Sequence, residues 1–135
     1  YRILFASFWY FNCSYRGYGY CSIYLCIILI LKYYVYVIEL DSKVADLRKF
    51  RLKNPKYIKG SGCVYVGQSS KKPEVRFEQH KEGYKSNKYA KYYGIKLRQD
   101  IYEKYNPIPN RKDAEDIEEY LGKRLREKGV GVWFN

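Results

Sequence analysis

The chain lacks methionine and has one histidine, four prolines and four cysteines among its 135 residues. A single imidazole excludes zinc fingers built on two histidines and catalytic zinc centres that need several. The cysteines stand at positions 13, 21, 26 and 63, without the closely spaced CxxC pairs of structural zinc sites. We therefore expect reduced cysteines and an intracellular, cytoplasmic protein rather than a disulfide framework.

Acidic residues are missing from the first 32 positions, whose charges are Arg2, Arg16 and Lys32. The remaining 23 basic and 14 acidic residues give residues 33–135 a net charge of +9. This shift in composition predicts an aromatic and apolar N-terminal extension, 1–32, followed by a basic domain, 33–135. Such a domain favours a polyanionic partner over a small metabolite.

Residues 21–40 have the length of a membrane span, but Lys32 and Glu39 interrupt them and tyrosines dilute them. Two interpretations stay open. In one, the segment anchors the basic domain at an anionic membrane surface. In the other, which we favour, Tyr33–Leu40 is a buried strand and the residues before it are either an extension or a non-native upstream translation.

The rest of the pattern predicts short strands alternating with helices. Tyr33–Leu40 and Cys63–Gly67 are short runs of β-branched and aromatic residues, typical of buried strands, joined by a polar, basic connection over 41–62. Residues 95–102 are expected to form a third strand or to continue as helix. Glycines, prolines and capping residues predict helices from Pro73 to about Glu82, from Ser86 or Asn87 to before Gly94, and from a cap at Asp113 to about Lys128. We therefore predict an α/β fold with a small three-stranded, mostly antiparallel sheet flanked by helices, and an extended tail over 130–135.

Two tyrosines near the middle of the first two strands, Tyr36 and Tyr65, could project from one face of the sheet. They either pack in the core or offer phenol groups to a reacting phosphate. A phenol has a pKa of about 10, so a role as base requires a neighbouring cation.

Arg76 and His80 are four residues apart and so share one face of the predicted helix. A guanidinium is suited to binding phosphate and to stabilising charge on pentavalent phosphorus. Taken singly, a histidine on a helix is more often a surface residue and an arginine a solvated charge. The pair at this spacing, just after a Tyr-Val-Gly strand, favours a functional role.

Glu118 lies within or beside the apolar stripe of the last helix, which Ala114, Ile117, Leu121 and Leu125 mark. A carboxylate on a buried face needs a partner. That partner is either a divalent metal ion or a neighbouring basic side chain.

Several candidate residues follow one another in the order of the GIY-YIG nuclease motifs. They are Tyr34-Val35-Tyr36, Tyr65-Val66-Gly67, Arg76, His80, Ala114-x-x-Ile117-Glu118 and Asn135. Over residues 33–135 the chain resembles the GIY-YIG nuclease superfamily. In the second signature Val66 replaces isoleucine. In the first, Tyr34 and Val35 replace glycine and isoleucine, and Tyr36 alone matches.

The resemblance implies a GIY-YIG fold and a metal-dependent endonuclease that hydrolyses DNA phosphodiester bonds without an organic cofactor. It implies that Glu118 holds Mg²⁺, or another divalent ion such as Mn²⁺, and that Tyr36 and His80 position or deprotonate water. It further implies that Tyr65 organises the water and Arg76 stabilises the phosphorane, with Asn135 closing the motif set. A module that binds nucleic acid on the same fold without cleaving it remains the alternative, beside the membrane-anchored basic domain.

Basic residues alternate with aromatic ones from Lys81 to Tyr93. This mixture suits contact with a nucleic-acid backbone combined with base stacking. It equally suits a solvated helix face with some tyrosines in the core. The candidate nucleic-acid contacts in this segment are Lys81, Lys85, Lys88 and Lys91.

Overall fold

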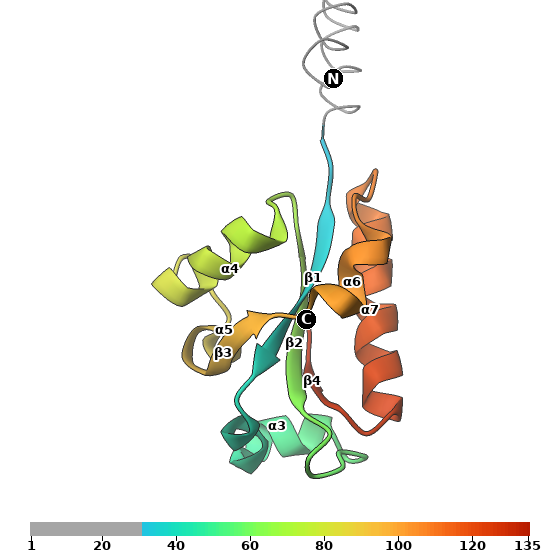
Figure 1. Ribbon diagram of the computed structural model, residues 1–135. Coiled ribbons are helices and arrows are strands. Elements are labelled where there is room, and N and C mark those ends of the chain that lie inside the picture. Colours follow the sequence, from blue (N-terminus) through green and yellow to red (C-terminus); the bar gives the residue numbers. More distant parts are fainter. Residues whose placement is uncertain (1–30) are drawn as a thin grey trace, which may run out of the picture. The chain divides into compact units, whose positions relative to one another are not determined.

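The computed structural model describes residues 31–135, in which Tyr33–Asn135 form one unit around a central sheet (Figure 1). The expectations for the extension, for Cys13, Cys21 and Cys26, and for the first part of the 21–40 run lie outside the described residues. Cys63 is a buried free thiol. Within residues 31–135, no helix combines the length and the apolar character that crossing a membrane requires.

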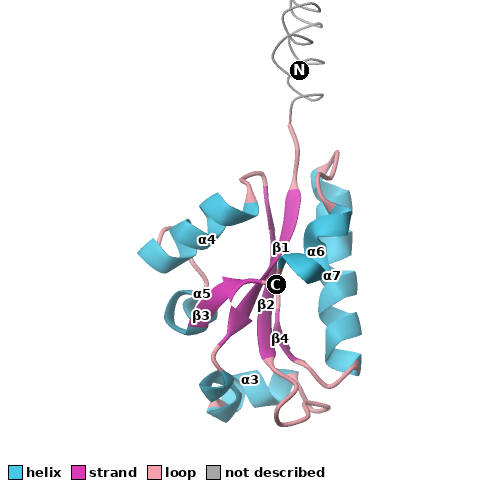
Figure 2. Cartoon of the chain, in the orientation of Figure 1, coloured by secondary structure: helices cyan, strands magenta, loops and turns pink. Residues whose placement is uncertain are grey.

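The sheet has four strands in the order β3-β1-β2-β4 and is mixed (Figure 2). Strand β1 (Tyr34–Leu40) pairs antiparallel with β2 (Cys63–Ser69) and with β3 (Gly94–Leu97). The sheet has one strand more than predicted, because part of the expected tail forms β4 (Gly131–Trp133), parallel to β2. Three residues are too few to show a strand periodicity, so the sequence gives this pairing no signal.

Helices lie on both sides of the sheet, which Figure 1 shows nearly edge-on. One side carries α4 (Pro73–Glu82) and α5 (Lys88–Tyr93), and the other carries α6 (Gln99–Tyr102) and α7 (Arg111–Glu127). The predicted start at Pro73 and stop at Gly83 are confirmed, and Asn87 caps α5 through its side chain. The expected α/β architecture with flanking helices is therefore present.

Three local predictions need correction. The 41–62 connection contains a 3-10 helix, Ser42–Asp46, and α3, Arg48–Lys53. These short helices are stabilised because the apolar side chains of Val44, Ala45 and Phe50 are buried. Within 95–102, the strand ends at Leu97 and helix follows, extended by a 3-10 turn at Glu103–Tyr105. The cap of α7 is Asn110, whose Oδ1 accepts the backbone N–H of Asp113 at 2.8 Å. Asp113 itself lies in the first helical turn, where its carboxylate accepts from the Asn110 amide.

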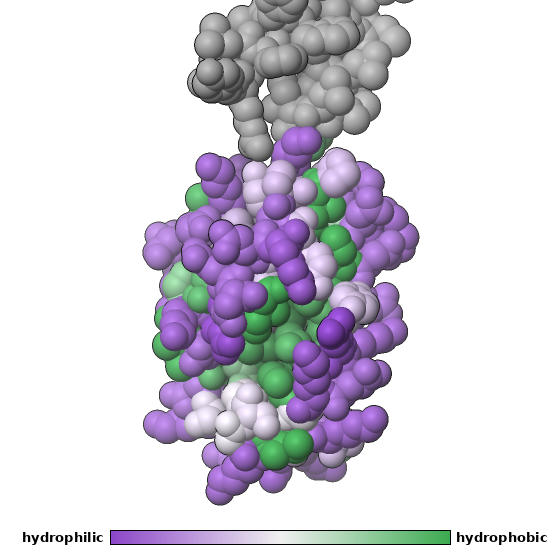
Figure 3. Space-filling view, turned by 45° about the vertical axis from the view of Figure 1, so that its right-hand side comes forward, coloured by the Kyte–Doolittle hydropathy of each residue, from purple (hydrophilic) through white to green (hydrophobic). Residues whose placement is uncertain are grey.

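The core lies between the sheet and the helices, and valines from β1 and β2 make up much of it. Hydrophilic side chains cover most of the outer surface in Figure 3, around a central apolar area. The positive charge of the domain is thus displayed to solvent, where a polyanion can reach it.

Candidate active site

Tyr36 and Tyr65 lie on the same face of the sheet, as predicted. In the β1–β2 register Tyr36 is opposite Gly67 and Ile38 is opposite Tyr65, so the two tyrosines are diagonal neighbours. Their ring centroids are 6.2 Å apart, and both side chains are buried. Burial raises the pKa of both phenols above the usual value.

Gly67 makes room for the ring of Tyr36. A Cβ atom at position 67 would lie 2.6 Å from both Cζ and Oη of Tyr36. The glycine of the Tyr65-Val66-Gly67 motif therefore has a steric function, which is to let the phenol cross β2 toward α4.

His80 of α4 contacts Tyr36 through a buried hydrogen bond of 2.8 Å between Nε2 and the phenol oxygen. The Nδ1 atom accepts the backbone N–H of Asn87 at 3.2 Å. A ring nitrogen that accepts carries no proton, so the proton of the neutral imidazole is on Nε2 and is donated to Tyr36. Burial, and after it the charge of Arg76, lowers the pKa of His80 to about 4. His80 is thus neutral near pH 7 and acts as a positioning residue for Tyr36.

Glu118 of α7 is only 6% exposed. One of its oxygens, Oε1, accepts the backbone N–H of Asn135 at 3.2 Å, and within residues 31–135 its carboxylate forms no ion pair. Burial raises the pKa of Glu118 to about 7, the N–H of Asn135 opposes this shift, and Glu115 adds to it. A buried carboxylate with so little compensation is a site that a cation would stabilise.

The C-terminal strand is held in place by Asn54, a buried residue that the sequence analysis missed. Its Oδ1 accepts the backbone N–H of Val132 at 2.8 Å and Nε of Arg126 at 3.2 Å, while its Nδ2 donates to the carbonyl of Phe50. This network fixes β4, from which Asn135 reaches Glu118. An asparagine among lysines and arginines after a short helix carries no pattern that would have identified it.

A cavity of about 590 Å³ brings most of the predicted site residues together. Tyr36, Tyr65, Arg76, Glu118 and Asn135 line it, and His80 lies behind Tyr36. The lining also includes residues that the sequence analysis did not select, namely Gln68, Arg111, Lys112, Glu115, Asp116, Glu119 and Phe134. Spacing along α7 could have indicated Glu115 and Arg111, which precede Glu118 by three and seven residues and so share its helix face.

Arg76 reaches the cavity but also holds the turn after α4. Its Nη1 donates to Oε1 of Gln79 and to the carbonyl of Tyr84, at 3.3 and 3.1 Å, and its Nη2 donates to the carbonyl of Lys85 at 2.6 Å. These bonds use three of the five N–H donors of a guanidinium, so two remain for a ligand.

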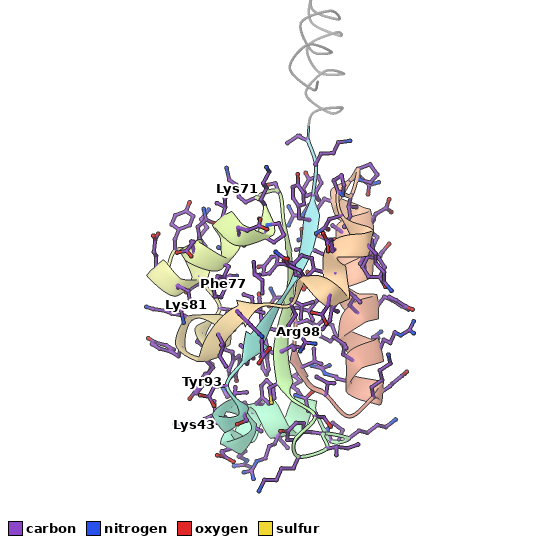
Figure 4. The ribbon with its side chains drawn as sticks, in the orientation of Figure 1. Lys43, Lys71, Phe77, Lys81, Tyr93 and Arg98 are labelled. Atoms are coloured by element: carbon purple, nitrogen blue, oxygen red, sulfur yellow. The ribbon has the colours of Figure 1, made fainter. Side chains whose placement is uncertain are left out.

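The four candidate lysines have different surroundings. The ammonium of Lys81 donates to the carbonyls of Lys91 and Gly94, which ties α4 to the end of α5 (Figure 4). The ammonium groups of Lys85, Lys88 and Lys91 each lie 5.1–5.6 Å from the ring centroid of an adjacent tyrosine. Lys81 therefore has a structural task, and the other three present cations beside aromatic faces.

The residues at Glu118 fit a divalent cation of the Mg²⁺ type. Within the described part of the chain no three His, Cys, Asp or Glu side chains form a ready ligand set. Mg²⁺ commonly uses only one or two carboxylates, with water and substrate phosphates as its other ligands. Glu118 offers one such carboxylate, lining the cavity, so its side chain is compatible with this mode of binding.

The chain matches no protein-family model, no curated protein and no solved structure. The GIY-YIG assignment therefore stays a prediction that rests on the order of the motif residues. The geometry above gives an independent basis for a functional proposal.

Proposed function

We propose that the chain is a metal-dependent endonuclease that hydrolyses DNA phosphodiester bonds, on a fold of the GIY-YIG type. The observation that carries this proposal is the buried 2.8 Å hydrogen bond between Tyr36 and His80. It orients a phenol at a cavity that Arg76 and Glu118 also line. A positioned phenol, a guanidinium and a buried carboxylate around one space can orient water, stabilise developing negative charge and hold a metal ion, which are tasks that phosphodiester hydrolysis uses.

Tyr36 orients the attacking water in this proposal. Because His80 donates to the phenol oxygen, the phenol proton points elsewhere and can bind water or a phosphate oxygen in the cavity. Burial raises the pKa of the Tyr36 phenol, and the charge of Arg76 opposes this only in part. Tyr36 therefore stays protonated and orients water through its hydroxyl group rather than by removing a proton. Tyr65 completes the polar lining beside it.

Arg76 binds the scissile phosphate through its two remaining donors. The three bonds to Gln79, Tyr84 and Lys85 fix the guanidinium before the substrate arrives, so its charge is already oriented when negative charge develops on phosphorus.

Glu118, supported by the backbone of Asn135, would hold the divalent ion. When bound there, Mg²⁺ or Mn²⁺ supplies positive charge that stabilises the phosphoryl oxygens of the transition state. The carboxylate gains a partner, which removes the cost of burying it uncompensated.

A nucleic-acid-binding module without cleavage is the second candidate. One observation favours it: three donors of Arg76 are engaged within the protein, as in a residue whose task is structural.

Nicking of supercoiled plasmid in the presence of Mg²⁺ distinguishes the two. We expect the wild type to nick and Glu118→Gln to lose metal-dependent nicking while it stays folded and binds DNA at least as well. The matched control is Glu127→Gln, an exposed carboxylate on the last turn of the same helix, which should nick normally. A folded Glu118→Gln that still nicks would show that the active site lies elsewhere. A wild type that binds but never nicks supports the binding module.

A further inference from the structure

The tyrosines between α4 and β3 divide into buried and exposed ones. Tyr89 is 2% exposed and packs between Phe50 and Trp133, with ring centroids 5.7 and 4.5 Å away. Tyr84 and Tyr92 are 56% and 70% exposed. Core packing thus explains Tyr89 but leaves two aromatic rings in solvent.

Tyr84 is joined to the candidate active site through its backbone. Its carbonyl accepts a hydrogen bond from Nη1 of Arg76, and the carbonyl of Lys85 accepts one from Nη2. Arg76 lines the cavity. The turn is further fixed by Gly83 in the left-handed region, φ 90°, and by the bond from the N–H of Tyr84 to the carbonyl of Gln79 at 2.9 Å. Tyr84 therefore lies on a fixed turn whose backbone is bonded to Arg76, a residue that lines the cavity.

A cation accompanies this ring. The ammonium of Lys85 lies 5.6 Å from the ring centroid of Tyr84. An exposed ring beside an ammonium can stack on a base while the cation binds the adjoining phosphate.

The reactive groups are recessed. Tyr36 and Glu118 are 1% and 6% exposed, so a phosphate reaches them only by entering the cavity. A duplex is stiff, with a persistence length of about 50 nm, whereas a single strand bends readily into a recess. The faces of paired bases are also covered by their neighbours in the stack, so a protein ring reaches them only at the cost of unstacking, whereas an unpaired base can offer its face freely.

We propose that Tyr84 stacks on an unpaired base beside the phosphate held in the cavity. The substrate class is then DNA with unpaired nucleotides, for which a single strand is the simplest case. This inference rests on the proposed function, because it places the base next to the same cavity.

Binding measured without any divalent ion tests the proposal. The probes are a fluorescently labelled single-stranded oligodeoxynucleotide and a blunt duplex of the same sequence, in buffer with EDTA, read by anisotropy. Tyr84→Ala should weaken single-strand binding by about 5- to 150-fold, the range that the loss of one base–aromatic stack gives. Its effect on duplex binding should be small, and Tyr84→Phe should retain single-strand binding.

Tyr92→Ala is the matched control, because Tyr92 is more exposed and has Lys91 5.3 Å from its ring but makes no contact with Arg76. It should bind both probes like the wild type. Unchanged single-strand binding by Tyr84→Ala, or an equal loss for both probes, would overturn the inference. This experiment measures binding and not cleavage. A protein that never nicks DNA would therefore refute the nuclease proposal without changing the conclusion about base stacking by Tyr84.

Discussion

Burial shifts the pKa values of two side chains of the site, Glu118 and His80, in opposite directions. Burial disfavours the charged form, so it raises the pKa of Glu118 to about 7 and lowers that of His80 to about 4. The negative charge of the ionised Glu118 carboxylate, which has no ion-pair partner within residues 31–135, would be compensated by a cation. The uncharged imidazole of His80, by contrast, is already satisfied on both nitrogens, by Tyr36 and by Asn87.

The neutral state of His80 predicts a pH dependence of stability. Between pH 6.5 and about 4 the unfolded chain binds a proton on this residue and the folded chain does not, so acidification favours unfolding. Over this window the wild type should lose on the order of 3 kcal/mol relative to His80→Gln, which cannot titrate. Urea unfolding at pH 7, 6, 5 and 4 measures this difference, and titration of Glu118 cancels in the comparison. A constant difference from pH 7 to 4 would show that His80 titrates normally.

The residues of the site differ in how well the sequence predicts them. Tyr36, Tyr65 and Glu118 could be placed because strand alternation and the helical stripe define the face on which each lies. The role of His80 could not be separated from that of a water-activating group, because the bond to Asn87 that fixes its tautomer arises from the turn before α5. Asn54 was beyond prediction, since its partners lie on β4 and α7, far along the chain.

At the scale of the elements, the site depends on how closely β1 and β2 approach at one point. Tyr36 and Gly67 are directly opposite each other, and the missing side chain of Gly67 is the space that the phenol occupies. The pairing of these strands was predictable from two runs of β-branched and aromatic residues. The pairing of β4 was not, because three residues carry no period and its alignment depends on Asn54.

Gly67→Ala should therefore displace Tyr36. A new Cβ atom 2.6 Å from the ring must push it aside, which we expect to destabilise the fold by about 1–3 kcal/mol and to abolish nicking. In a Tyr36→Ala background the same substitution should cost little, because the clash has gone. A double-mutant cycle by urea unfolding checks this. Equal costs in both backgrounds would mean that Gly67 is needed for another reason.

For the whole molecule, the surface is charged and the site is recessed. Residues 33–135 carry a net charge of +9, and the ammonium groups of Lys85 and Lys91 lie beside the exposed rings of Tyr84 and Tyr92. The charge could be read from composition. The sequence could not show which lysines are engaged within the protein and which are free to contact a ligand, because the hydrogen bonds of Lys81 depend on where α5 ends.

The affinity for DNA should accordingly fall steeply with salt. Each neutralised phosphate releases counterions, and six such contacts lower the affinity by about 10³-fold between 50 and 200 mM salt. Lys88→Gln should reduce the slope of log affinity against log salt by about 1. Lys81→Gln should change this slope less and instead lower the melting temperature. Anisotropy titrations at four salt concentrations measure the slopes, and a flat dependence in the wild type would contradict the electrostatic interface.

For the proposed nuclease, the order in which contacts form along the chain would separate binding of DNA from its cleavage. The bond between Tyr36 and His80 joins residues 44 apart, whereas the bond that holds β4, from Val132 to Asn54, joins residues 78 apart. Longer closures cost more entropy and tend to form later in folding. Until β4 docks, Glu118 lacks the backbone bond from Asn135. If the chain is the nuclease proposed above, incompletely folded copies would bind DNA without being able to cleave it, and a cell would be protected from copies that have not finished folding.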